Sequence, residues 1–274
     1  MKKEDGDSVV VWANAVVEAR YSLSVPEQRL ILWLAAQIER EDDALQERTV
    51  GILEMQELSG GHNGRIYEQF EEVCTRLQGR VLEIRLDDKR KRRKINWLHR
   101  SDYNDGEGTV TLRFHDDLKP ALLQLKERFS VIPLKTVFRL RGGYAVRWYE
   151  MLVSKKHVKT FSMSVQDLRL WLGIQVDELA AVKDLRKRAL DIPRNELSAK
   201  ADLTFVYVPT KTGKRITGWK FTVKENRPRP VQRQLPLPIM EEQRETVEEV
   251  SKAKKALAAM KAAVKAAART AGAD

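Results

Sequence analysis

Residues 160–223 read TFSMSVQDLRLWLGIQVDELAAVKDLRKRALDIPRNELSAKADLTFVYVPTKTGKRITGWKFTV, and their pattern is the strongest indication of the fold. It opens with a short strand, predicted at 160–163. Ser164 has the side chain of a helix N-cap, an acidic residue follows three positions later, and Gly173 is typical of a helix stop. The stretch therefore begins with a strand and a short helix.

A longer helix and a hairpin complete the stretch. The helix is predicted at about 178–190, and its pattern allows an extension past Pro193. Two strands of alternating apolar residues follow at 203–208 and 216–223, joined by a polar turn. A further helix, at 144–153, precedes the stretch. The order helix, strand, helix, helix and hairpin is that of a winged helix, in which the second helix of the pair enters the DNA major groove.

The first half of the chain fits the same plan with one more strand. Ser24 and Glu27 form the pattern of a capping box, and a helix with one apolar face is expected to follow. A second helix is predicted at 65–77, and Cys74 on its apolar stripe is expected to be buried. Three strands are predicted to form a meander, at 81–86, around 95–97 and at 110–114.

We therefore predict an α+β chain of two tandem winged-helix domains, 1–130 and 131–224. The remaining segment, 225–274, changes in composition. Four prolines predict an extended Pro-rich linker, and the last residues favour an Ala/Lys-rich C-terminal helix exposed to solvent.

Composition excludes several classes of protein. The single cysteine rules out a disulfide framework and fits a reducing compartment. The four histidines share no metal-ligand spacing, and the glycine clusters lack the pattern of a phosphate-binding loop. No apolar run is long enough to span a membrane, and acidic residues argue against an export signal at the N-terminus. We predict a cytoplasmic protein that is not an enzyme, with no catalytic residue, metal site or cofactor.

Positive charge is concentrated in one part of the chain. Residues 1–130 hold 21 Lys and Arg against 24 Asp and Glu, whereas residues 131–227 hold 20 against 9, a net charge of +11. Such a basic segment beside a nearly neutral one favours a polyanionic partner, most often nucleic acid. A generic solubilising surface is the alternative.

The candidate DNA-binding residues lie in three places. On the predicted helix at 179–190, an apolar stripe leaves an arc of cations, and two further cations extend it: Lys183, Arg186, Lys187, Arg188, Arg194 and Lys200. Arginines there can bond guanine, while lysines mostly neutralise phosphate. The hairpin tip carries Lys211, Lys214 and Arg215. The run 89–94 is all cationic and includes Arg90, Arg92 and Arg93. For all three, a solvated basic surface without a ligand is the alternative.

Four motifs, in order along residues 12–224, resemble the iteron-binding replication initiator family of bacterial plasmids. The first is Asn14-x-x-x-Glu18-Ala19-x-Tyr21-x-Leu23-x-x-x-Glu27-Gln28-Arg29-Leu30-Ile31-Leu32. The next two are Tyr144-Ala145-x-Arg147-x-Tyr149-Glu150-x-Leu152 and Leu168-Arg169-x-x-Leu172-Gly173. The fourth, similar to the recognition helix and wing, is Val182-Lys183-Asp184-Leu185-Arg186-Lys187-Arg188-Ala189-Leu190 followed by Asp202-Leu203-x-Phe205.

This resemblance implies that the second domain reads double-stranded DNA at directly repeated origin sites. It also implies that the first domain dimerises or adds a DNA contact, that monomers initiate replication, and that dimers repress the chain's own gene. Such initiators recruit the host initiator and helicase. Gln234, Leu235 and Leu237 resemble part of the peptide that binds the bacterial sliding clamp. A transcriptional repressor without a replication role is the alternative, and the histidine spacing argues against a nicking enzyme.

Overall fold

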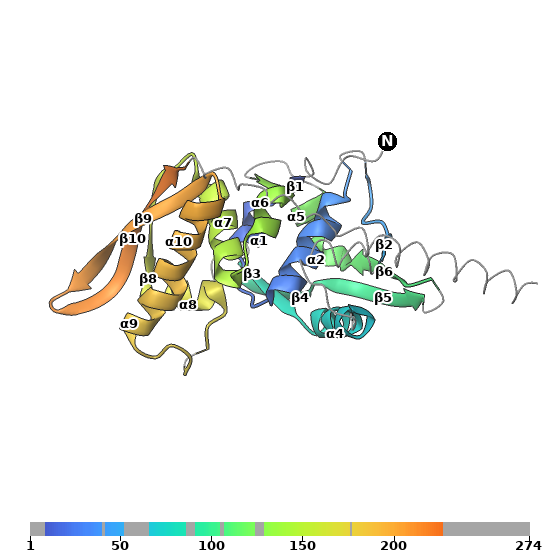
Figure 1. Ribbon diagram of the computed structural model, residues 1–274, viewed down its shortest axis with the longest axis horizontal. Helices are drawn as coiled ribbons and strands as arrows, with labels where there is room; N and C mark the ends of the chain where they lie inside the picture. Colours follow the sequence, from blue (N-terminus) through green and yellow to red (C-terminus); the bar gives the residue numbers. More distant parts are fainter. Residues whose placement is uncertain are drawn as a thin grey trace, which may run out of the picture. The chain divides into compact units, whose positions relative to one another are not determined.

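The computed structural model of the chain (Figure 1) describes residues 9–39, 42–51, 66–85, 91–104, 107–123, 129–175 and 177–226. They lie in a compact unit that spans Met1–Arg229. The predicted linker from residue 227 on, the C-terminal helix, Arg90 and the residues proposed to bind a sliding clamp lie outside the described residues.

The first half of the chain builds three small antiparallel sheets. β1 (Val9–Ala13) pairs with β7 (Phe129–Pro133), β3 (Val81–Arg85) pairs with β4 (Arg92–Asn96), and β6 (Thr109–Phe114) lies between β2 (Arg48–Gly51) and β5 (Leu98–Asn104). The helices are α1 (Asn14–Val17), α2 (Val25–Ala36), α4 (Ile66–Gln78), α5 (Lys119–Leu122), which follows the 3-10 turn η1 (Asp116–Leu118), and α6 (Leu134–Arg139). Val10 pairs with Ile132, so β7 lies beside β1, the first strand of the described residues.

The predicted three-stranded meander is wrong. The strand at 81–85 pairs with β4 and, at Glu83, bridges to Arg20, whereas the chain leaves that sheet at Trp97 to begin β5. Trp97 is fully buried, with its ring edge-on to Tyr21 at 5.1 Å, and its backbone bonds Arg80 on one side and His115 on the other. Burial of this large side chain fixes the crossing between the two sheets.

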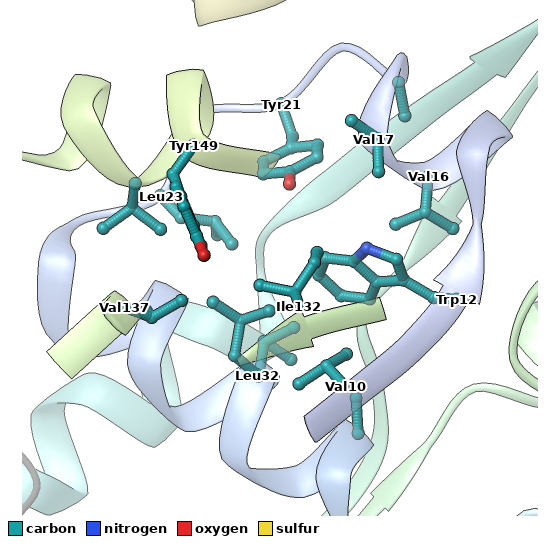
Figure 2. Packing of buried hydrophobic residues seen from close by; sticks show 14 of the residues in the cluster. Val10, Trp12, Val16, Val17, Tyr21, Leu23, Leu32, Ile132, Val137 and Tyr149 are labelled. Atoms are coloured by element: carbon teal, nitrogen blue, oxygen red, sulfur yellow. The ribbon is translucent and has the colours of Figure 1, made fainter. Parts of the chain in front are cut away.

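Helix α2 lies in the core of the first half. The predicted capping box is confirmed: the Ser24 hydroxyl accepts from the Glu27 N–H at 3.5 Å, and the Glu27 carboxylate accepts from the Ser24 N–H at 2.7 Å. The prediction that this helix buries a single apolar face understates its burial, because every residue from Glu27 to Ala35 is buried. Figure 2 shows Leu32 of this helix beside Val10 of β1 and Ile132 of β7.

The polar residues that α2 buries have specific partners. The Glu27 carboxylate forms ion pairs with Arg76 at 3.5 Å and Arg80 at 3.3 Å. The Arg29 guanidinium donates to the carbonyls of Phe138 and Leu140 at 3.0 and 2.9 Å. A buried charge without such partners would destabilise the fold, so these contacts make an all-round buried helix possible.

The second half has the predicted order of elements. It contains α7 (Gly143–Lys155), β8 (Thr160–Ser164), α8 (Val165–Leu172), α9 (Val182–Leu185), the π-helical turn η2 (Arg186–Asp191), α10 (Ile192–Lys200), β9 (Leu203–Thr212) and β10 (Arg215–Glu225). β10 lies between β8 and β9 in one sheet. The Trp148 ring on α7 is the centre of its core, stacked on Phe205 at 4.4 Å and edge-on to Trp171 at 5.0 Å.

Two predicted boundaries in this half are wrong. The long helix starts at Val182 rather than 178, because the Arg169 side chain holds the preceding loop through the carbonyls of Gln175, Glu178 and Leu179. The polar turn predicted at 209–215 is a two-residue turn, Gly213-Lys214, because backbone pairing extends both strands beyond their apolar residues.

Several contacts join the second half to residues 17–22. The Trp171 indole N–H donates to the Val17 carbonyl at 2.9 Å, and the buried Arg147 guanidinium donates to the carbonyls of Val17 and Ala19. Arg147 also donates to Glu150 at 2.8 Å. Burial raises the pKa of Glu150, and the neighbouring guanidinium opposes this rise.

Candidate nucleic-acid interface

The candidate interface is built on one continuous helical run, residues 182–200. Leu185, Ala189, Leu190 and Leu197 are completely buried and fix its inner side. Lys183, Arg186, Lys187 and Arg188 are exposed, so the predicted arc of cations faces outward. The run continues through Pro193, as the sequence pattern allows, by way of the π-helical turn.

Asp191 organises the two arginines on either side of it. Its carboxylate lies 3.7 Å from Arg186 Nε and 3.6 Å from Arg194 Nη2, and it accepts a hydrogen bond from the Tyr207 hydroxyl at 2.6 Å. The Arg194 guanidinium lies 5.7 Å from the centre of the Tyr207 ring. The helix and strand β9 are thereby joined beside two partly exposed arginines.

The protonation of Tyr207 follows from this geometry. Burial raises the pKa of Tyr207 to about 12, with a further contribution from the hydrogen bond to Asp191. The phenol therefore keeps its proton at neutral pH and stays a donor to the carboxylate.

The other helix cations differ in their partners. Among the described residues, Lys183, Lys187 and Arg188 form no ion pair. Lys200 is half-buried, and its ammonium lies 2.6 Å from the Glu196 carboxylate. Glu196 also accepts from the backbone N–H of Arg141 and Gly142 at the start of α7. The geometry gives Lys200 an intramolecular partner, whereas the other three remain available to an external anion.

The hairpin tip brings Lys211, Lys214 and Arg215 together in exposed positions. Gly213 has a φ of 61°, a conformation that glycine adopts without strain. β8 pairs with β10 only over residues 218–222, and Figure 1 shows the hairpin continuing past it. These three cations can approach a phosphate backbone without hindrance from the rest of the sheet.

The third predicted cluster is only partly described. Arg92 and Arg93 lie within β4, so the view of the whole run 89–94 as a connection between strands needs correction. The Arg92 guanidinium lies 3.3 Å from the Glu83 carboxylate, which also pairs with Arg20 at 3.2 Å. β4 includes part of the cationic run, because its backbone pairs with β3 from Arg92 on. The charged side chains are tolerated there because they are exposed.

Sequence reasoning did not select Asp191, Tyr207 or Trp148 for the site. Asp191 lies three residues before Arg194, a spacing at which side chains meet on a helix, and that spacing is the signal that could have found it. Tyr207 and Trp148 carry no such signal, because their contacts join segments far apart in the chain.

Neither a metal site nor a membrane helix is found in the part of the chain that the structure describes. Across those residues, no three His, Cys, Asp or Glu side chains are grouped so as to hold a metal ion. None of their helices has the length and apolar character needed to cross a bilayer.

Comparison with known proteins gives two family matches. Residues 9–153 match the family described as "Initiator Replication protein, WH1", and residues 164–223 match "Initiator Rep protein, WH2". These matches agree with two winged-helix domains of mixed helices and strands. The predicted division at residue 130 stays a prediction; β7, which spans it, pairs with β1.

The chain is also similar to solved structures, and its fold is shared by the first of those named here. The Pi initiator protein, crystallised in complex with iteron DNA, is 17% identical with a TM-score of 0.65, over 81% of this chain and 98% of that one. Domains 2 and 3 of RctB are 12% identical with a TM-score of 0.44, over 75% of this chain and 84% of that one. The WH1 domain of MSBI1.176, a replication protein isolated from a multiple sclerosis patient, is 21% identical with a TM-score of 0.30. This match covers 42% of this chain and 86% of that one.

Proposed function

Because the chain belongs to the family of initiator replication proteins, we propose that it starts plasmid replication by binding directly repeated origin sites, or iterons. The observation that carries this proposal is the exposed arc of cations on the helix 182–200, beside a hairpin with a cationic tip. A helix and wing so charged suit the major groove and the flanking phosphates. The complex of the Pi initiator with iteron DNA supports the same role for this chain.

In this proposal the cations have different tasks. Arg186 and Arg194, oriented by Asp191, read bases, while Lys183, Lys187 and Arg188 neutralise phosphates. Lys211, Lys214 and Arg215 add backbone contacts from the wing. Lys200 contributes through the overall potential, because its ammonium is paired with Glu196.

The two parts of the chain would divide the work. Residues 131–224 read the repeats, and residues 1–130 dimerise or add a DNA contact through the cluster that contains Arg92 and Arg93. Monomers start replication and dimers repress the gene. The host initiator and helicase are the expected partners, together with a sliding clamp at residues 234–237. We expect a cytoplasmic protein without a catalytic activity or a cofactor.

A selection experiment tests DNA recognition. The full chain is incubated with a pool of random duplexes, and bound molecules are sequenced over several rounds. Recovery of one motif supports sequence-specific reading, and recovery of no motif contradicts it. Two copies of the motif in direct repeat are then placed on a plasmid with the gene. Replication that depends on both supports an initiator, whereas repression without replication supports a transcriptional repressor.

A salt series tests the assignment of the phosphate contacts. Lys187→Ala should reduce the slope of log K against log salt by about 0.9, because one phosphate contact is lost. Lys135→Ala is the matched control, since Lys135 is also exposed but lies on α6, outside the candidate interface. Equal slopes for both variants would contradict the placement of Lys187 at the interface.

A further inference from the structure

The helical run 182–200 contains a wide turn at the position of its cations. Residues Arg186–Asp191 are π-helical, between the α-helical segments α9 and α10. Turns of this kind are rare and often occur at functional sites. Three of the candidate DNA-binding residues, Arg186, Lys187 and Arg188, lie within it.

Pro193 explains why a regular α-helix is unfavourable here. Proline has no N–H, so it cannot bond the carbonyl four residues earlier, and in a regular α-helix its ring clashes with that carbonyl. The carbonyl in question belongs to Ala189, in the middle of the wide turn. A widened turn relieves the clash and leaves this oxygen without its usual helical donor.

Trp148 supplies another donor. Its indole N–H bonds the Ala189 carbonyl at 2.7 Å, and both residues are completely buried. The indole ring is itself fixed by Phe205, Trp171 and Phe221, with ring centres 4.4 to 5.0 Å away. The donor therefore has one well-defined position, and the turn is held by a rigid neighbour on α7.

The geometry points to Trp148 as a positioning residue for sequence-specific DNA binding. Together with Pro193 it stabilises the wide turn, and that turn determines the position of Arg186 relative to Arg194. Arg186 is the first residue of the turn, Arg194 follows it on α10, and both converge on Asp191, at 3.7 and 3.6 Å. Base reading requires donors in fixed positions, whereas phosphate contacts tolerate displacement. The inference rests on the proposed function, because it concerns how the same helix reads DNA.

Binding of the full chain to the duplex selected by the wild type, and to a scrambled duplex, tests this role. Trp148→Phe keeps an aromatic ring but removes the N–H. The matched control is Trp219→Phe, since Trp219, on β10, is equally buried and its indole nitrogen has no hydrogen-bond partner among the described residues. The two variants lose similar volume from the core, but only Trp148→Phe also removes a hydrogen bond.

We expect Trp148→Phe to lower the ratio of specific to scrambled affinity roughly tenfold, the size of one lost base contact, with an unchanged salt slope. Trp219→Phe should change the ratio less than twofold, although both substitutions lower the melting temperature. An unchanged ratio for Trp148→Phe, or an equal loss in both variants, would overturn the inference.

A second variant decides the matter if Trp148→Phe does not fold. Pro193→Ala returns an N–H to the helix and allows the turn to close as regular α-helix. We expect it to select a different motif or to lose the wild-type specificity ratio, while the chain stays folded. The wild-type motif at the wild-type ratio would overturn the inference. Failure of the wild type itself to select any motif would instead refute the proposed function.

Discussion

Replacement of Gly173 by alanine tests the contact between the second half of the chain and residues 17–22. Gly173 ends α8 with a φ of 68°. A Cβ atom there would lie 2.6 Å from the Ser22 Cβ, 2.9 Å from the Tyr21 carbonyl oxygen and 3.1 Å from the Ser22 Cα. Two of these atoms belong to the backbone, so they cannot give way by a simple rotation of a side chain. Glycine is required here for its conformation and also for the close approach of a second segment.

The expected cost has two parts. A left-handed conformation costs a residue with a Cβ about 1–2 kcal/mol. Forcing an extra carbon into a packed contact costs a further 1–3 kcal/mol or so. We therefore expect Gly173→Ala to lower the free energy of unfolding by about 2–5 kcal/mol.

Gly213 provides the matched control. Its φ is 61°, nearly that of Gly173, but apart from Gly213 and its two chain neighbours no residue has an atom within 4 Å of the position that a Cβ would occupy. Gly213→Ala should therefore cost only the conformational part, about 1–2 kcal/mol. The difference between the two variants isolates the contact with Tyr21 and Ser22.

Urea unfolding of the full chain, followed by tryptophan fluorescence and far-ultraviolet circular dichroism, measures both variants. The transition midpoints should decrease in the order wild type, Gly213→Ala, Gly173→Ala. If the two variants agree to within about 0.5 kcal/mol, the reasoning is refuted, because packing of α8 against residues 21–22 would then add no cost beyond the backbone conformation.

Three further predictions concern stability and reactivity. Burial raises the pKa of the Cys74 thiol to about 12, so iodoacetamide at pH 8 should label it only when urea unfolds the chain, as mass spectrometry can measure. The Asn226 side chain donates to three backbone carbonyls at the end of α10, so Asn226→Ala should lower the free energy of urea unfolding by about 1–3 kcal/mol, more than Asn195→Ala. Burial alone would raise the pKa of Glu196, but hydrogen bonds from Lys200 and two backbone N–H groups lower it below the ordinary value of a glutamate. Its stabilising effect is present above the unfolded-state pKa and is lost as the pH falls through the lower folded-state pKa, so the gap in unfolding free energy between wild type and Glu196→Gln should close in acid.

Local signals in the sequence predicted the helix ends well. The capping box at Ser24, the Ser164 N-cap that accepts from the Asp167 N–H at 3.0 Å, and the glycine after α8 are all confirmed. Each of these features depends on residues within four positions of one another. Chemistry on that scale can be read from the chain without knowledge of the tertiary structure.

Strand pairing could not be read in the same way. The four residues of β2 include a single buried side chain, Val50, and therefore show no alternation that separates them from a loop. Likewise, the outer part of the hairpin is polar and is held by backbone pairing between β9 and β10. Which strands meet depends on distant segments, and Trp97 directs the chain into a second sheet only because Tyr21 and Trp12 pack against it.

The sequence alone does not show which cations of the helix 182–200 have intramolecular partners. Their contacts in the structure do. Arg186 and Arg194 share Asp191 at 3.7 and 3.6 Å, too far for a short charge-assisted hydrogen bond. Partly exposed pairs of this kind contribute about 0–1 kcal/mol, so the arginines can exchange the carboxylate for a base edge at little cost. Before DNA binds, the two ion pairs restrict the motion of both arginine side chains. Less conformational entropy is therefore lost on binding. The carboxylate of Asp191 therefore favours base reading, although it lowers the positive charge that attracts DNA.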